Sequence, residues 1–193
     1  MATTLPPGRS RDTSAFEALL LAAGDGAPWA WQHLYGWLAP AVAGYLRAQG
    51  AREVDDLTSE TFLGVVRGIT RFHGDEGQFR SWVFVIAHRR LQDERRLLGA
   101  RPHAAVLDDA AAPLAAGDAE ADALRNLATD RVRAVCERLA PDQRDVLLLR
   151  LVADLTVDQI ARVLGKTPGA VKALQRRGFD AVRRIFEREG VPL

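Results

Sequence analysis

Large apolar residues recur at intervals of three and four along most of this chain, and this spacing constrains its fold more than any other feature. Because an α-helix has about 3.6 residues per turn, residues at this spacing lie on one helix face. Three such stripes precede residue 99: Leu34, Leu38, Val42, Tyr45 and Leu46; Leu57, Phe62, Val65, Val66 and Ile69; and Trp82, Val83, Ile86, Ala87 and Leu91. No segment alternates apolar and polar residues as a half-buried strand would. The sequence therefore predicts an all-α fold.

A change of composition divides the chain into two halves. Residues 99–123 are rich in alanine, contain Gly99, Pro102, Pro113 and Gly117, and hold few large apolar groups. Such a segment cannot bury a core, so it is predicted to be a linker. Residues 71–78, which contain Gly74 and Gly77, are predicted to form a loop within the first half. We expect two small helical domains joined by a flexible acidic linker. The N-terminal tail and a lead-in helix take residues 1–26, and the first domain takes 27–98. The linker takes residues 99–126, and the second domain takes 127–193.

Residues 155–179 have the pattern of a helix-turn-helix. Thr156 and Gln159 have the spacing of a capping box, in which two free backbone donors at a helix start are satisfied. Gly165 suits a tight turn that requires a positive φ angle. Thr167 can cap the following helix, and Pro168 suits its first turn. The predicted seam between the two helices consists of Ile160, Ala161, Leu164, Val171 and Leu174.

The distribution of charge suggests what the second helix binds. The net charge is only +1, but residues 162–184 hold seven basic residues and one acid, whereas 102–122 hold five acids and no Lys or Arg. Long cationic and amide side chains on a helix can reach phosphates and base edges in a major groove, and free N–H groups at a helix start can hold a phosphate. The candidate DNA-binding residues are Thr167, Gly169, Lys172, Ala173, Gln175, Arg176 and Arg177. The alternative is a helical hairpin with a solvated basic face.

Several classes of protein are disfavoured by composition. The chain has 193 residues, of which 48% are hydrophobic and 26% charged, as in ordinary globular domains. One cysteine, Cys136, cannot form an internal disulfide, and this fits a reducing cytoplasm. No apolar run approaches the roughly 20 residues of a membrane-spanning helix, so no membrane insertion is expected. The four histidines are scattered, and no phosphate-binding loop or nucleophile elbow is present, so we expect no enzyme activity, metal or cofactor.

Three segments, at Asp55–Leu63, Phe79–Arg96 and Leu139–Val182, resemble those of bacterial extracytoplasmic-function (ECF) sigma factors of the sigma-70 family. The stretch Asp55–Leu63 resembles the family's signature for binding core RNA polymerase. Phe79–Val83, followed by Ile86–Ala87 and Asp93–Arg96, resembles its promoter-melting segment. Leu139–Leu149 with Leu155–Val182 resembles its C-terminal promoter-binding domain. The resemblance covers residues 27–98 and 127–186. It implies a sigma factor that binds core polymerase and reads the −10 element with the N-terminal domain and the −35 element with the C-terminal one.

The resemblance also implies partners and site residues. The polymerase contact, on the β′ clamp helices with further contact to the β subunit, falls on Asp55, Asp56, Leu57, Glu60 and Phe62. The −10 contact falls on Phe72, His73, Gly74, Arg80, Trp82, His88, Arg89 and Arg90. Trp82 is equally well explained as a core residue, Phe79 is assigned to the core, and the acids Asp75 and Glu76 would repel phosphate. An anti-sigma factor is a further candidate partner.

Several interpretations and one departure from the family pattern stay open at this point. Many family members carry Arg-Leu where this chain has Leu174-Gln175, so the −35 sequence cannot be transferred. The acidic linker suits either a path through a basic polymerase channel or a simple tether. A plain helix-turn-helix regulator would explain residues 155–179 but not the Asp55–Phe62 segment. Two further functions compete with that of a sigma factor. One is an enzyme, and the other is a helical adaptor that only binds proteins.

Overall fold

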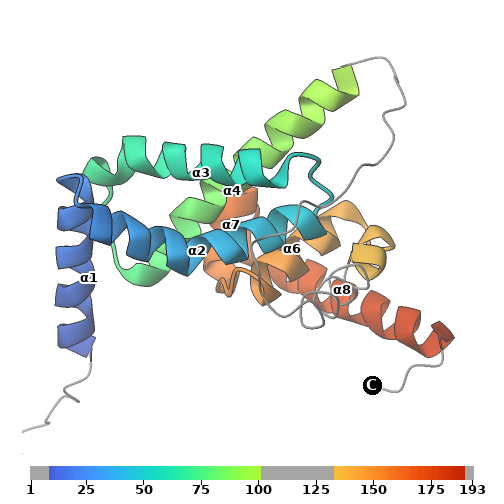
Figure 1. The fold of residues 1–193 in the computed structure, drawn as a ribbon. Helices are drawn as coiled ribbons and strands as arrows, with labels where there is room; N and C mark the ends of the chain where they lie inside the picture. Colours follow the sequence, from blue (N-terminus) through green and yellow to red (C-terminus); the bar gives the residue numbers. More distant parts are fainter. Residues whose placement is uncertain (1–8, 101–132, 190–193) are drawn as a thin grey trace, which may run out of the picture.

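The computed structural model describes residues 9–100 and 133–189, and every regular element in them is helical (Figure 1). The elements are α1 (Arg9–Gly24), α2 (Pro28–Ala48), α3 (Val54–Gly68), the 3-10 turn η1 (Ile69–Arg71), α4 (Glu76–Ala100), α6 (Pro141–Leu151), α7 (Val157–Leu164) and α8 (Pro168–Glu189). The predicted all-α fold is confirmed. Most of the predicted linker, residues 101–126, lies outside the described residues. The described part of the C-terminal domain begins with helical residues 133–137, followed by a turn at 138–139.

The N-terminal domain, α1–α4, is built around the three predicted apolar stripes, except that Val66 of the second stripe is exposed. Leu34, Leu38, Val42, Tyr45 and Leu46 are all fully buried on α2. They pack in one core with buried residues of α3 and α4, among them Val65, Val83 and Leu91. Phe16 of α1 joins this core through an edge contact with Phe79, with 5.6 Å between ring centroids. This arrangement places α1 across one end of the domain (Figure 1).

The loop before α4 is shorter than the sequence suggested. The predicted loop ran to Gln78, but the helix begins at Glu76. Asp75 explains the difference, because its Oδ1 accepts from the backbone N–H of Gln78 at 2.7 Å while Gln78 Oε1 accepts from the backbone N–H of Asp75 at 2.9 Å. This reciprocal pair closes two free donors at a helix start. Asp75, which is ill suited to phosphate, therefore has a structural role as a helix cap.

The C-terminal domain, residues 133–189, contains the predicted helix-turn-helix. Thr156 and Gln159 form the capping box, and Gly165 has the positive φ of 63° that the turn requires. The hydroxyl of Thr167 accepts from the backbone N–H of Ala170 at 3.2 Å, which confirms the second cap. Of the predicted seam residues, Leu164 is half-buried and the rest are buried, and Val163 of α7 is also buried in the core.

The two domains are packed against each other. Helix α7 contacts α4, and α6 contacts α2; Figure 1 shows both α6 and α7 lying beside the N-terminal helices. One hydrophobic core runs through both domains, and a smaller cluster of Leu139, Leu147 and Ile185 holds the end of the C-terminal domain. The sequence predicted two domains but did not predict this packing.

Candidate nucleic-acid and polymerase interfaces

The basic face of α8 is the clearest candidate for contact with DNA. Lys172, Arg176 and Arg177 are exposed, and none of them forms an ion pair or hydrogen bond with another described residue. Leu174 points into the core, while Gln175 is half-buried, consistent with the expectation that it turns partly toward the seam. Three unpaired guanidinium and ammonium groups on one helix can neutralise phosphates or donate to base edges.

The start of α8 has free backbone donors beside this face. Thr167 and Gly169 are exposed, and Ala173 is half-buried on the second turn. The N-terminal N–H groups of a 22-residue helix carry the positive end of its dipole, so they suit a phosphate. The seven residues predicted to bind the −35 element are thus brought together on the first three turns of one helix.

The aromatic residues predicted to meet the −10 strand are largely packed against the protein itself. The rings of Phe72 and Trp82 stack with centroids 5.1 Å apart and an interplanar angle of 25°. Another neighbour of Trp82 is Gly68, where a Cβ would lie 2.6 Å from the indole ring. Phe79 is fully buried, as expected. Trp82 is therefore half core and half surface, and the described part of this segment offers no open aromatic platform.

The basic residues predicted for the same strand are divided between the surface and the interior. His73 and Arg89 are exposed, and Gly74 lies in the loop between η1 and α4. Arg90 lies 3.7 Å from the carboxylate of Glu60. Arg80 is half-buried, with its guanidinium 5.0 Å from the centroid of a Trp37 ring. The eight predicted residues thus do not form one continuous exposed surface.

His88 lies in a buried polar network. Its Nδ1 is 2.8 Å from the hydroxyl of Tyr45. Burial raises the pKa of Tyr45, so the hydroxyl keeps its proton and can donate it to His88. Burial also lowers the pKa of His88, although the nearby carboxylate of Asp145 opposes this shift. His88 is therefore neutral near pH 7 and does not present a cation to phosphate in this arrangement.

Helix α3 presents a mixed acidic and apolar face. Asp55, Asp56 and Glu60 are exposed, as a protein-binding site requires, whereas Leu57 and Phe62 are buried at 7% and 6% exposure. Both side chains lie in the domain core in this structure, and their contact with a partner stays a prediction.

The apolar part of that face comes from residues that the sequence prediction missed. Leu63 and Val66 on α3 are 52% and 48% exposed. Tyr35 of α2 is 48% exposed, and its ring packs against that of Phe62 with the centroids 4.6 Å apart. Leu63 lies seven residues after Asp56 and three residues after Glu60, so it shares a helix face with both acids. That spacing could have identified it from the sequence. We call Asp56, Glu60, Leu63 and Val66 the α3 face.

Metal-binding clusters and membrane-spanning helices are absent from the described residues. Within residues 9–100 and 133–189, no three His, Cys, Asp or Glu side chains gather as they would around a metal ion. The same residues contain no helix with the length and apolar content needed to cross a membrane. The thiol of Cys136 is buried, and this raises its pKa.

Comparison with known proteins identifies both domains. Sigma-70 region 2 matches residues 31–100 and sigma-70, region 4 matches residues 129–181. The chain is 31% identical over 186 residues to the ECF RNA polymerase sigma factor BldN of Streptomyces coelicolor, spanning 93% of this chain and 69% of BldN. The chain belongs to the ECF group of the sigma-70 family. Like the other members of this family, this sigma factor directs promoter-specific transcription initiation with RNA polymerase.

Other relatives agree with this assignment. The ECF sigma factor ShbA of Streptomyces griseus is 26% identical, covering 93% of this sigma factor and 99% of ShbA. The sigma factor CarQ of Myxococcus xanthus is 29% identical, covering 84% and 92% of the two chains. Among solved structures, CnrH in complex with the cytosolic domain of CnrY has the same fold, with a TM-score of 0.65, 21% identity, and coverage of 89% of this chain and 96% of CnrH.

Proposed function

We propose that this sigma factor docks on core RNA polymerase through the α3 face, reads the −10 element with the N-terminal domain and reads the −35 element with α8. The observation that carries the proposal is the row of unpaired cations on α8, in the domain that matches sigma-70 region 4. In this proposal the protein binds and does not catalyse any step itself. Without the polymerase, it therefore starts no transcription. We place that activity in the cytoplasm, with the polymerase.

The α3 face has the chemistry of a docking surface for a basic-rimmed helical partner. Asp56 and Glu60 provide two carboxylates one helical turn apart, and Leu63 and Val66 extend the face with apolar area. Charge complementarity steers such a partner, and burial of the apolar residues holds it. We assign this partner to the β′ clamp helices, with further contact to the β subunit.

The −35 assignment divides the cations of α8 into two roles. Lys172 and Arg176 lie one turn apart on one face of the N-terminal half of the 22-residue helix, where insertion in a major groove is deepest, whereas Arg177 is turned away from that face by about 100°. We therefore assign them to base edges and Arg177 to the phosphate backbone. An anti-sigma factor is a further proposed partner, and the structure of CnrH with the cytosolic domain of CnrY offers a geometry for designing a test of it.

A transcription assay with purified components tests the proposal. The full chain and core polymerase should together give start-site-specific run-off transcripts, and neither should do so alone. The double variant Asp56→Lys/Glu60→Lys should bind core polymerase at least tenfold more weakly. Its control is Glu17→Lys/Asp25→Lys, which makes the same charge change at exposed positions outside α3. Unchanged polymerase affinity of the α3 variant, with intact helical content, would refute the docking assignment.

A further inference from the structure

One side of α4 lies along α3 over several turns. Trp82 lies against Gly68, where an added Cβ atom would be 2.6 Å from the indole ring. One turn later, Ile86 lies against Gly64, where an added Cβ atom would be 2.9 Å from its Cγ2. A real Cβ atom almost never comes within 3.0 Å of such a neighbour, so the two glycines permit this close packing. The middle of α3 is therefore fixed on α4 by shape.

The next two residues on this side of α4 hold α3 by charge. Arg90 Nε lies 3.7 Å from a carboxylate oxygen of Glu60. Glu94, one turn beyond Arg90, reaches the chain just before α3, where its Oε1 accepts from the backbone N–H groups of Arg52 at 3.1 Å and Glu53 at 3.2 Å. Residues four apart share a helix face. We call these four residues the α4 stripe: Trp82, Ile86, Arg90 and Glu94.

Helix α3 has no cap of its own at the end that the α4 stripe reaches through Glu94. Helices favour Ser, Thr, Asp or Asn as the capping residue, because the short side chain accepts from a free backbone N–H of the first turn. In α3 the capping residue is Glu53, and its side chain makes no such hydrogen bond. A carboxylate that accepts from a backbone N–H makes a charge-assisted and therefore stronger hydrogen bond. Glu94 thus supplies from α4 an acceptor that the start of α3 lacks.

The acceptor supplied by Glu94 leaves the carboxylate of Asp56 free. Asp56 is the third residue of α3, and in a capping box the acidic or amide side chain at this position reaches back to the backbone N–H of the capping residue. Here that N–H, on Glu53, donates to Glu94. Asp56 is exposed and has no hydrogen bond or ion pair with another described residue. Its carboxylate therefore remains available to a cation of a partner.

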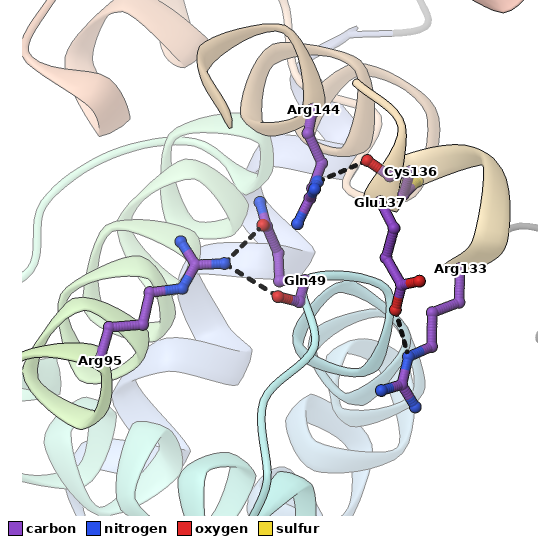
Figure 2. Close-up of polar contacts among 6 residues, drawn as sticks. All are labelled: Gln49, Arg95, Arg133, Cys136, Glu137 and Arg144. Atoms are coloured by element: carbon purple, nitrogen blue, oxygen red, sulfur yellow. Dashed lines mark hydrogen bonds and ion pairs between the residues drawn. The ribbon is translucent and has the colours of Figure 1, made fainter. Parts of the chain in front are cut away.

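The residue after Glu94 fixes the other end of the same loop. Arg95 donates to both the side-chain and the backbone oxygen of Gln49, at 2.9 Å each (Figure 2). Gln49 ends α2 and is 3% exposed, and its Nε2 donates to Oδ1 of Asp145 at 2.5 Å. Two consecutive residues of α4 thus hold residues 49–53, the loop between α2 and α3, at both ends.

The segment 93–96, which resembles part of a promoter-melting segment, therefore has two kinds of residue. Asp93 and Arg96 are exposed and pair with each other at 2.8 Å, one turn apart on their own helix. Glu94 and Arg95 are half-buried, and their hydrogen bonds go to the loop before α3. This inner pair serves the helix that carries the proposed polymerase contact.

We propose that Glu94 is a positioning residue for polymerase docking, which fixes the start of α3 and keeps Asp56 free to bind the polymerase. The inference rests on the proposed function of the α3 face and deepens it, because Glu94 acts through Asp56 and does not itself touch the partner. Without Glu94, the start of α3 takes up several arrangements, including one in which Asp56 folds back on the N–H of Glu53. Apparent affinity then falls with the fraction of molecules in the competent arrangement.

The first test removes the acceptor from the full chain. Glu94→Ala should weaken binding to core polymerase by about tenfold, which corresponds to about 1.4 kcal/mol. Glu94→Gln keeps an Oε1 acceptor and should restore most of the affinity. Asp93→Ala is the matched control, because it removes the adjacent carboxylate, whose ion pair lies within α4. Wild-type affinity of Glu94→Ala, or an equal loss in Asp93→Ala, would overturn the proposal.

A double-mutant cycle separates positioning from a general loss of structure. In an Asp56→Ala background there is no carboxylate left to position, so Glu94→Ala should weaken polymerase binding by less than about threefold. The same tenfold loss in both backgrounds would indicate a merely structural role and would overturn the proposal.

The variant Asp56→Lys/Glu60→Lys, measured in the same assay, tests the proposed function separately. Wild-type affinity of this variant would refute docking through the α3 face, and the positioning role with it. A loss of affinity in this variant, together with wild-type affinity of Glu94→Ala, would refute the positioning role alone.

Discussion

The turn between α7 and α8 offers a sharp test of how the helix-turn-helix is specified. Gly165 has a φ of 63°, and a Cβ atom on it would meet nothing within 4 Å. The substitution Gly165→Ala therefore introduces no clash, and its whole cost is the left-handed backbone. For an L-residue that cost is about 1–2 kcal/mol.

Gly169→Ala is the matched control for this substitution. Gly169 lies in the first turn of α8, with no positive φ and with open space around it. Both variants restrict the unfolded chain equally, so this contribution cancels between them, and Gly169→Ala gains about 0.4–1 kcal/mol on its own. We expect the two free energies of unfolding to differ by about 1–2 kcal/mol, the left-handed backbone cost alone, with Gly165→Ala the less stable.

Urea and thermal unfolding, followed by far-ultraviolet circular dichroism, measure this difference. For a chain of this size, 1 kcal/mol corresponds to about 2–4 °C, so a difference of about 1–2 kcal/mol should place the midpoints about 2–8 °C apart. Gly165→Asn should fall between the two alanine variants, because asparagine tolerates the left-handed region. If Gly165→Ala and Gly169→Ala had the same midpoint, the turn would not depend on a left-handed residue and the reasoning would be wrong.

Three further predictions concern other parts of the chain. Thr156→Ala should lower the free energy of unfolding by about 1 kcal/mol through loss of the cap, whereas Thr156→Ser should retain most of it. Gly68→Ala should cost about 1–3 kcal/mol and change the fluorescence of Trp82, since the new methyl group displaces the indole; unchanged fluorescence would contradict the packing. Because burial lowers the pKa of His88, its contribution to stability is complete above the ordinary value of about 6.5 and declines as pH falls below it. His88→Gln should therefore lose less stability than wild type between pH 7 and pH 5 in urea titrations.

The sequence predicted features whose physical cause is local. The capping box of Thr156 and Gln159, the left-handed Gly165 and the Thr167 cap each depend on residues within four positions of one another, and each is present in the structure. The apolar stripes of α2 also required only the helical period. The orientation of α3 was also within reach of the sequence, since Leu63 lies seven and three residues after the acids Asp56 and Glu60 and is exposed with them, whereas Leu57 is buried.

The contacts between the domains could not be predicted because they join residues far apart in the chain. Gln49 and Asp145 are separated by 96 positions, and neither lies in a recognisable motif. Gln159 is a more instructive case. Its Oε1 accepts from the backbone N–H of Thr156 at 2.7 Å, and its Nε2 donates to Gly77, 82 positions away. The capping role alone is enough to explain a glutamine at this position. The sequence therefore gives no sign of the hydrogen bond to Gly77.

The chemistry of the domain interface favours a contact that opens without unfolding either domain. Beside its apolar residues, the interface uses groups that water can satisfy: a carboxylate, amides, backbone oxygens and a guanidinium. When such a contact opens, water replaces the lost partners. Each neutral hydrogen bond therefore stabilises the packing of one domain on the other by only about 0.5–1.5 kcal/mol. Water cannot replace the contacts of the apolar residues along α2 in this way. Exposing their surface to water costs about 25 cal/mol per Å². Because the hydrophobic core runs through both domains, separating them also exposes apolar area, and this adds to the small cost of losing the polar contacts.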